Sequence, residues 1–219
     1  MATMQKDEST EATEQDEINP WTDMLSSPRK TINWVTNGNS NLLSTLILLY
    51  LGGVYFGLAQ AIANSRGDNN TITEIFSKAF LISGVGGLIY YHIYVWVIDF
   101  SASWFGGKGN FQKTRDALAW SMIPSIFGIF IVVAGSILFE EELFMSEAPE
   151  INASKFLTMS YLGFTGITWI ITIWYVILLV VTIGEVQRLT IVRVVLTLLA
   201  STALIMLPII ALVFLFTQE

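Results

Sequence analysis

The sequence contains no cysteine and a single histidine, His92. Without cysteine there is no disulfide framework, no thiolate metal site and no thiol nucleophile. One histidine also excludes motifs that need two, such as the paired helix histidines of zinc proteases. We therefore expect no metal, no cofactor and no enzymatic activity. An intramembrane hydrolase is a distant alternative, because a Gly-x-Ser-x-Gly nucleophile elbow is missing.

Charged residues are scarce, at 13% against 53% hydrophobic residues, whereas soluble domains carry about 25% charged residues. The apolar residues form five long runs: Leu42–Ala63, Phe76–Trp104, Leu118–Phe139, Phe156–Ile183 and Ile191–Thr217. Each run reaches the roughly 20 residues that a helix needs to cross the hydrocarbon core of a bilayer. The sequence thus predicts an all-α integral membrane protein with a five-helix transmembrane bundle.

The acidic residues behind the net charge of −7 crowd the amino-terminal segment, where few large apolar residues occur. This composition is typical of a solvated, disordered tail and disfavours nucleic acid as a partner. A secretory signal is not expected, because the first apolar run begins only at Leu42. We divide the chain into an acidic disordered tail (1–18), an interfacial amphipathic helical segment (19–38) and a five-helix membrane domain (39–219).

Basic residues predict the orientation of the bundle. One side of the membrane receives Lys6, Arg29, Lys30, Lys108, Lys113, Arg115, Arg188 and Arg193, and the other receives only Arg66, Lys78 and Lys155. Lysine and arginine in short loops favour the cytoplasmic side. The amino terminus is therefore expected in the cytoplasm and the carboxyl terminus outside it.

Two capping signals, Asn19 before Pro20 and Ser27 before Pro28, predict short helices ahead of the first span. The apolar stripe of this segment consists of Trp21, Met24, Leu25, Pro28, Ile32 and Val35, with Arg29 and Lys30 outside the stripe. Such a stripe fits a helix pair in the interface of the cytoplasmic leaflet. It fits equally a segment that packs on the bundle's own cytoplasmic face.

Glycine and proline give further expectations inside the spans. Gly53 and Gly57 have the spacing of closely approaching helices, which favours internal packing over dimerisation. Pro124 and Pro208 are expected to kink the third and fifth spans, because each removes a backbone donor.

The stretch from Gly106 to Arg115 joins the second and third spans. It is not a phosphate-binding loop, because Gly109 follows Lys108 where a serine or threonine is required. A glycine turn before a basic helix entry suits lipid headgroups or a partner, or else a tight turn with snorkelling cations. The candidate interface comprises Trp21, Leu25, Pro28, Arg29, Lys30, Gly106, Gly107, Lys108 and Lys113.

Ionisable residues in the spans form a second candidate site, since such residues are costly in a membrane and often functional. His92 and Asp99 share one face of the second span, about 10 Å apart along the axis. They suggest a polar path, or a neutral His92 hydrogen-bonded to a serine, threonine or tyrosine of an adjacent helix. The remaining members, expected near Asp99 as a structural charge cluster, a cavity mouth or a headgroup site, are Arg115, Glu185, Arg188 and Arg193.

Two stretches resemble signatures of the Yip (Ypt-interacting protein) domain family. They are the glycine turn Gly106–Phe111 with the helix entry Ala117–Pro124, and Trp174-Tyr175 with the joint Gly184–Arg193. Asn19–Trp21 and Ser27–Ile32 look like the leading segment of bacterial members. The resemblance implies a five-helix bundle with a cytoplasmic amino end. It does not extend to the small-GTPase binding of eukaryotic members, because their Asp-Leu-Tyr-Gly-Pro motif does not occur here.

Together these expectations describe a multi-pass protein of the bacterial cytoplasmic (inner) membrane. We predict that it binds membrane lipids and another membrane or membrane-associated protein, and that it acts as a partner-binding or membrane-organising component. The alternative is a small transporter or lipid-translocating protein that uses a polar path near His92 and Asp99.

Overall fold

The computed structural model describes residues 18–216, so the tail predicted for 1–18 lies outside the described residues except for its last position. The described part is helical and contains no strand. Its elements are α1 (Pro20–Ser26), α2 (Pro28–Trp34), η1 (Val35–Asn39), α3 (Leu42–Ala63), η2 (Arg66–Asp68), α4 (Ile72–Lys78), η3 (Ala79–Ser83), α5 (Gly84–Trp104), α6 (Phe111–Ser121), α7 (Ile123–Leu138), η4 (Glu140–Phe144), α8 (Pro149–Ala153), α9 (Lys155–Gln187) and α10 (Ile191–Phe216).

Polar side chains begin many of these helices by accepting hydrogen bonds from otherwise unpaired backbone N–H groups. The Asn19 side chain accepts from the backbone N–H of Trp21 and caps α1 as predicted, whereas Ser27 makes no such bond to α2. Asn41 caps α3 and Asn110 caps α6. Thr71 and Glu74 form a reciprocal capping box at α4. The sequence therefore sets the helix starts close to the polar joints.

Five helical stretches are long and apolar enough to cross a membrane: Leu42–Ala63, Ile72–Trp104, Phe111–Leu138, Lys155–Gln187 and Ile191–Leu215. Large apolar side chains cover their outer surfaces; Phe130 is 67% exposed and Ile137 is 76% exposed. Water-facing surfaces rarely carry such continuous apolar cover. The chain is a multi-pass membrane protein, and the predicted number of spans is confirmed.

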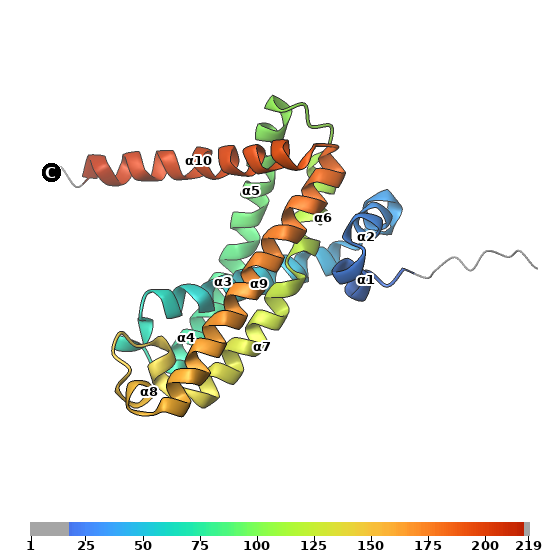
Figure 1. The fold of residues 1–219 in the computed structure, drawn as a ribbon. Helices are drawn as coiled ribbons and strands as arrows, with labels where there is room; N and C mark the ends of the chain where they lie inside the picture. The colour runs from blue at the N-terminus through green and yellow to red at the C-terminus, as the bar shows by residue number, and fades with distance from the viewer. Residues whose placement is uncertain (1–17, 217–219) are drawn as a thin grey trace, which may run out of the picture.

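The turns gather at two ends of the bundle (Figure 1). At one end, the turn between α5 and α6 contacts the turn between α9 and α10, where the Lys108 N–H donates to the Gln187 carbonyl at 3.0 Å. At the other end, η2 meets η4, and the Ser146 N–H donates to the Asp68 carboxylate at 2.9 Å. Joints that the charge pattern assigned to one side of the membrane therefore lie together.

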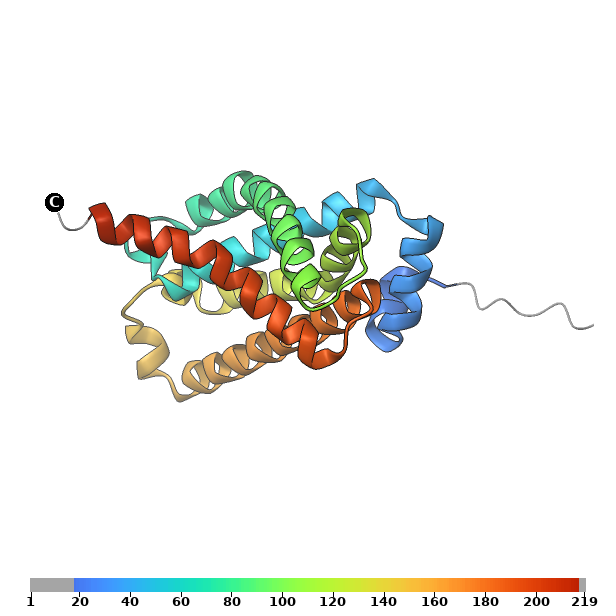
Figure 2. The same cartoon turned by 90° about the horizontal axis from the view of Figure 1, so that it is seen from above.

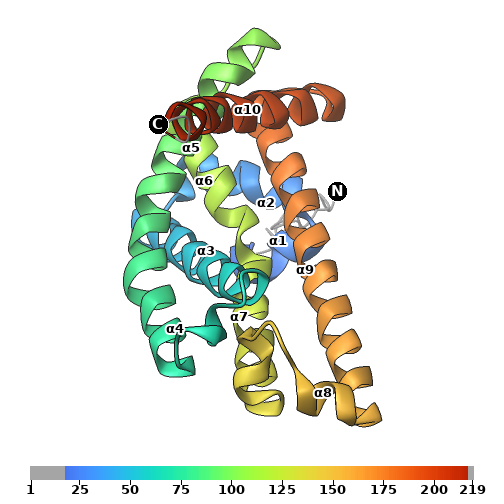
Figure 3. The same cartoon turned by 90° about the vertical axis from the view of Figure 1, so that its left-hand side faces the viewer.

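Helices α5, α7 and α9 run along the bundle, and α3 packs against both α5 and α7 (Figure 3). The contact between α3 and α5 depends on two glycines. A Cβ atom on Gly87 would lie 2.6 Å from the Cα atom of Gly53. Gly57 likewise faces Ser83 of η3 within the same chain. These glycines are used for internal packing, as expected.

The segment before the first span packs on the bundle. Met24, Ile32 and Val35 are fully buried and belong to the same core as Leu48, Leu118 and Ile183 of the spans. Trp21 lies beside Trp120 of α6, with ring centroids 5.1 Å apart. The deepest part of the apolar stripe therefore faces α6 and α9, while Arg29 and Lys30 stay exposed.

The two membrane prolines have different surroundings. Helix α6 ends at Ser121 and α7 begins at Ile123, so Pro124 stands at the start of a new helix. Pro208 instead lies inside the continuous helix α10. Helix α10 contacts α5 and α9 and then extends away from α9 toward the C-terminus (Figure 2). Most of its apolar surface faces outward.

Candidate functional site

The main polar site lies where the two basic joints meet, around the side chain of Gln187 at the end of α9. Gln187 is 1% exposed, and its Oε1 atom accepts a hydrogen bond from the Gly109 N–H at 2.9 Å. A Cβ atom on Gly107 would lie 2.7 Å from Gln187 Oε1, and one on Gly109 would lie 2.6 Å from the same side chain. The glycine turn is therefore shaped to close over this amide.

Gln187 also reaches the carboxylate of Asp99 in α5. Gln187 Nε2 donates to Asp99 Oδ1 at 2.7 Å, and Thr114 Oγ1 donates to the same oxygen at 3.0 Å. Gln187 Nε2 further donates to Thr114 Oγ1 at 2.9 Å. Because buried polar groups without partners are costly, this three-residue network holds α5, α6 and α9 together at the end of the bundle.

A second acid of this end, Asp116, lies on α6 and, unlike the partly buried Asp99, is buried. Asp116 Oδ1 accepts from Thr45 Oγ1 at 3.1 Å and forms an ion pair with Arg115 Nη2 at 3.1 Å. The two side chains of the pair are 15% and 4% exposed, Arg115 being the more accessible. The hydrogen bond from Thr45 joins the start of α3 to α6.

The residues predicted to cluster around Asp99 make separate contacts at this end of the bundle. Within residues 18–216, no ion pair joins Asp99 and Arg115, because Arg115 turns to its neighbour Asp116. Glu185 accepts from Asn33 Nδ2 of α2 at 2.7 Å. Arg193 Nη1 donates to the Phe105 carbonyl at 3.4 Å, and Arg188 ends α9 in the left-handed conformation with φ of 56°. The predicted residues share one end of the bundle but act in separate contacts.

The His92 side chain forms a hydrogen bond with the backbone of its own helix, α5. Its Nδ1 atom lies 2.7 Å from the Leu88 carbonyl, so Nδ1 carries the proton and donates. The imidazole ring lies 6.4 Å from the Phe111 ring, centroid to centroid. In the described part of the chain, no hydrogen bond or ion pair links His92 to Asp99. The partner of His92 is therefore a backbone carbonyl of its own helix and not the expected serine, threonine or tyrosine of an adjacent helix.

The candidate interface residues divide into partly buried and exposed groups. Gly106 takes a φ of +86°, which favours glycine, and Gly107 faces Gln187. Lys113 Nζ donates to Asn37 Oδ1 at 3.2 Å, and Leu25 and Pro28 are partly buried. The exposed cations of this end are Arg29, Lys30, Lys108, Arg188 and Arg193, and we refer to them as the basic face.

Thr45, Thr114, Asp116 and Gln187 were not among the predicted site residues, although they form the best-connected polar contacts of this end. Hydropathy and charge patterns identify charged residues within the spans. Thr45, Thr114 and Gln187 carry no charge, so these patterns do not distinguish them from other polar residues near helix ends. The local signal was the polar pair Glu185 and Gln187, which interrupts an otherwise apolar helix.

Comparison with known proteins identifies the family of the chain. No curated protein and no solved structure matches the chain significantly. The family model of the Yip1 domain matches residues 22–213, which include most of α1, all of α2, the glycine turn, the Gln187 joint and nearly all of α10. The chain therefore belongs to the Yip1 domain family.

Proposed function

We propose that this protein is a non-enzymatic, partner-binding or membrane-organising component of the bacterial cytoplasmic membrane, and that it acts through the basic face. The single observation that carries the proposal is that hydrogen bonds join three separate segments beneath that face: α2, the turn between α5 and α6, and the end of α9. Lys108 N–H donates to the Gln187 carbonyl, and Asn33 of α2 donates to Glu185 of α9. A surface held in this way is preorganised, so binding orders few additional groups.

The charges of this end favour a partner with acidic groups. Among residues 18–216, the acids near this end already accept hydrogen bonds: Asp23 from Asn19, Asp99 from Gln187 and Thr114, Asp116 from Thr45 and Arg115, and Glu185 from Asn33. The cations of the basic face are exposed to solvent at the same end of the bundle. Complementary charge of this kind steers association and sets specificity.

A cavity of about 470 Å³ supports the same proposal. It lies between α2 and the turn from α9 to α10, and its lining includes Arg29, Glu185 and Arg188 together with Val180 and Ile191. A partner side chain that is acidic at its tip and apolar along its stem fits this lining. Partner anchors commonly fill such pockets.

The transporter alternative is not favoured by these contacts. His92 is engaged with the Leu88 carbonyl, and Asp99 is engaged with Thr114 and Gln187. A proton or solute path through them would first have to break a satisfied network. The basic residues of the joints support a cytoplasmic position for the basic face.

Photo-crosslinking in native membranes tests the proposal. A photoreactive residue replaces Arg188 on the basic face, and a control replaces Glu147, which is exposed at the opposite end. We expect one identified protein to be captured reproducibly from position 188 and not from position 147. Capture should fall several-fold in the double variant Lys108→Glu with Arg29→Glu and persist in Lys155→Glu. A chain that is captured only as itself, or equally from both ends, contradicts the proposal.

A further inference from the structure

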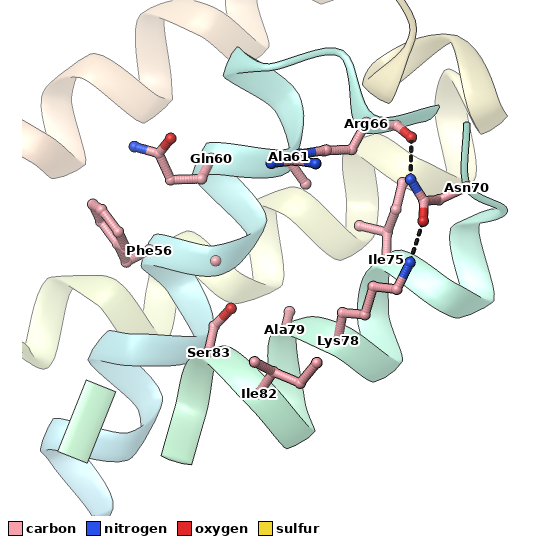
Figure 4. Close-up of a pocket in the computed structure, with 11 residues that line it drawn as sticks. Phe56, Gln60, Ala61, Arg66, Asn70, Ile75, Lys78, Ala79, Ile82 and Ser83 are labelled. Carbon is pink, nitrogen blue, oxygen red and sulfur yellow. Dashed lines mark hydrogen bonds between the residues drawn. The ribbon is translucent and has the colours of Figure 1, made fainter. Parts of the chain in front are cut away.

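A cleft at the other end of the bundle lies between α3 and the helical stretch α4–η3 (Figure 4). Its volume is about 330 Å³, near the lower end of the range for ligand pockets. The lining residues are Phe56, Gly57, Gln60, Ala61, Arg66, Asn70, Ile75, Lys78, Ala79, Ile82 and Ser83, and we call this site the Lys78 cleft. It is separate from the basic face.

The lining of the Lys78 cleft holds two cations, Arg66 and Lys78, and no acidic residue. Asn70 fixes the polar end: its Nδ2 atom donates to the Arg66 carbonyl at 2.9 Å, and its Oδ1 atom accepts from Lys78 Nζ. An ammonium group carries three donors, and Asn70 takes one of them. Among residues 18–216, no ion pair with an acid neutralises either cation.

The opposite wall of the cleft is apolar and faces the membrane. Phe56 is 58% exposed and Ile82 is 67% exposed. Phe56 lies seven residues before the end of α3 at Ala63, about 10 Å deeper along the helix axis. The cleft therefore runs from the level of the span ends, where headgroups lie, toward the hydrocarbon.

The backbone beside the cleft departs from a regular α-helix. Residues Ala79–Ser83 form a π-helical turn directly after Lys78, and single π turns inside α-helices often occur at functional sites. Gly57 allows this turn to approach α3, since a Cβ atom there would lie 2.3 Å from Ser83 Oγ. The turn and the glycine together form the floor of the cleft.

We propose that the Lys78 cleft binds the phosphate group of an anionic phospholipid. Lys78 Nζ and the Arg66 guanidinium donate to the phosphate oxygens, and the upper part of an acyl chain lies along Phe56 and Ile82. Charge-assisted hydrogen bonds of this kind are strong, and arginine suits the geometry of phosphate. The apolar wall selects a lipid over a free phosphate, because a small anion leaves Phe56 and Ile82 without a contact.

Lipid titration monitored by native mass spectrometry tests this site with the purified full chain in detergent. Phosphatidylglycerol, phosphatidylcholine and inorganic phosphate are the probes. We expect phosphatidylglycerol to bind best and inorganic phosphate not to displace it. Removing each cation, in Lys78→Gln or Arg66→Gln, should weaken phosphatidylglycerol binding about tenfold, whereas Lys78→Arg should retain it.

Lys155→Gln is the matched control, because Lys155 is an exposed cation at the start of α9, outside the cleft. An equal loss in Lys155→Gln means that general surface charge attracts the lipid, which overturns the proposal. Displacement by inorganic phosphate also overturns it, since the ligand would then be a small anion.

A second measurement uses the unchanged chain and so does not depend on how variants fold. A photoreactive phosphatidylglycerol is incorporated into vesicles with the protein, and the adducts are mapped by peptide mass spectrometry. We expect adducts between positions 56 and 83. Adducts only at other positions overturn the proposal. The proposed partner binding at the basic face lies at the other end, so either proposal can fail alone.

Discussion

Gln187 Nε2 donates a hydrogen bond to Asp99 Oδ1 over 2.7 Å, between side chains that are 88 positions apart in the chain. The side-chain oxygen of Gln187 accepts a hydrogen bond from the Gly109 N–H, and its backbone carbonyl accepts one from the Lys108 N–H. One buried amide therefore connects α5, the glycine turn and α9. The hydrogen bonds of Gln187 thus join the end of the second span to the end of the fourth span beneath the basic face.

Replacement of Gln187 by leucine should destabilise the fold. The substitution keeps a similar volume but leaves the Gly109 N–H unpaired and removes one donor from Asp99. We expect the free energy of unfolding to fall by about 1–3 kcal/mol, the usual cost of an unsatisfied buried group. Denaturant unfolding in mixed micelles measures this quantity.

Gln112→Leu is the control for that variant, because Gln112 is exposed near the start of α6. It should change the free energy of unfolding by no more than about 0.5 kcal/mol, as is usual for surface substitutions. Equal stability of the Gln187 and Gln112 variants would show that the network adds nothing to the fold.

Much of the fold follows from the sequence, because crossing a bilayer demands long apolar helices. The first predicted span, Leu42–Ala63, coincides with α3. The third apolar run begins at Leu118, and Arg115 was expected in the helix entry before it, yet the helix begins still earlier, at Phe111. Hydropathy misses this polar first part, because Thr114 and Asp116 lose contact with solvent only through partners on other helices.

The contacts of the candidate site were harder to predict from the sequence than the fold. The sequence predicted Arg115 near Asp99, but Asp99 accepts its hydrogen bonds from the uncharged side chains of Thr114 and Gln187. Arg115 uses the adjacent Asp116 instead. Charge patterns identify which residues need a partner, whereas the choice among partners depends on how the helices pack.

The ion pair between Arg115 and Asp116 should be sensitive to the loss of one partner. Asp116→Leu leaves the Arg115 guanidinium without its acid in a largely buried position, and we expect a loss of about 3 kcal/mol in the free energy of unfolding. The double variant Arg115→Met with Asp116→Leu should recover most of this loss, since apolar replacement of a buried pair is often neutral.

Unfolding of the two single variants and the double variant in micelles completes this mutant cycle. The coupling between the sites is the quantity to be compared. Additive losses in the double variant would mean that the contact between Arg115 and Asp116 contributes nothing beyond the two separate sites.

The orientation of the bundle can be tested cleanly because the natural chain has no cysteine. Single substitutions Lys108→Cys and Glu147→Cys each create one thiol, both at exposed positions on opposite ends. In sealed right-side-out membrane vesicles, a membrane-impermeant maleimide should label Glu147→Cys at once. Lys108→Cys should react only after the vesicles are opened. The reverse pattern would contradict a cytoplasmic basic face.

Close packing of α3 on α5 should make two glycines sensitive to a single methyl group. A Cβ atom on Gly53 would lie 2.5 Å from the Ser83 carbonyl oxygen, and one on Gly87 would lie 2.6 Å from Gly53 Cα. Both obstacles are backbone atoms, which cannot rotate away as a side chain can. Gly53→Ala and Gly87→Ala should therefore each reduce the free energy of unfolding by about 1–3 kcal/mol, as overpacking does.

Gly86 provides the matched control in the same helix, because a Cβ atom there would meet nothing within 4 Å. Gly86→Ala should be neutral or stabilise the protein by up to about 1 kcal/mol, since alanine is the better helix former. Unfolding in micelles therefore separates the two effects by sign: helix propensity raises stability at position 86, and backbone contact lowers it at position 87. If both alanines stabilise equally, α3 and α5 do not meet at these glycines.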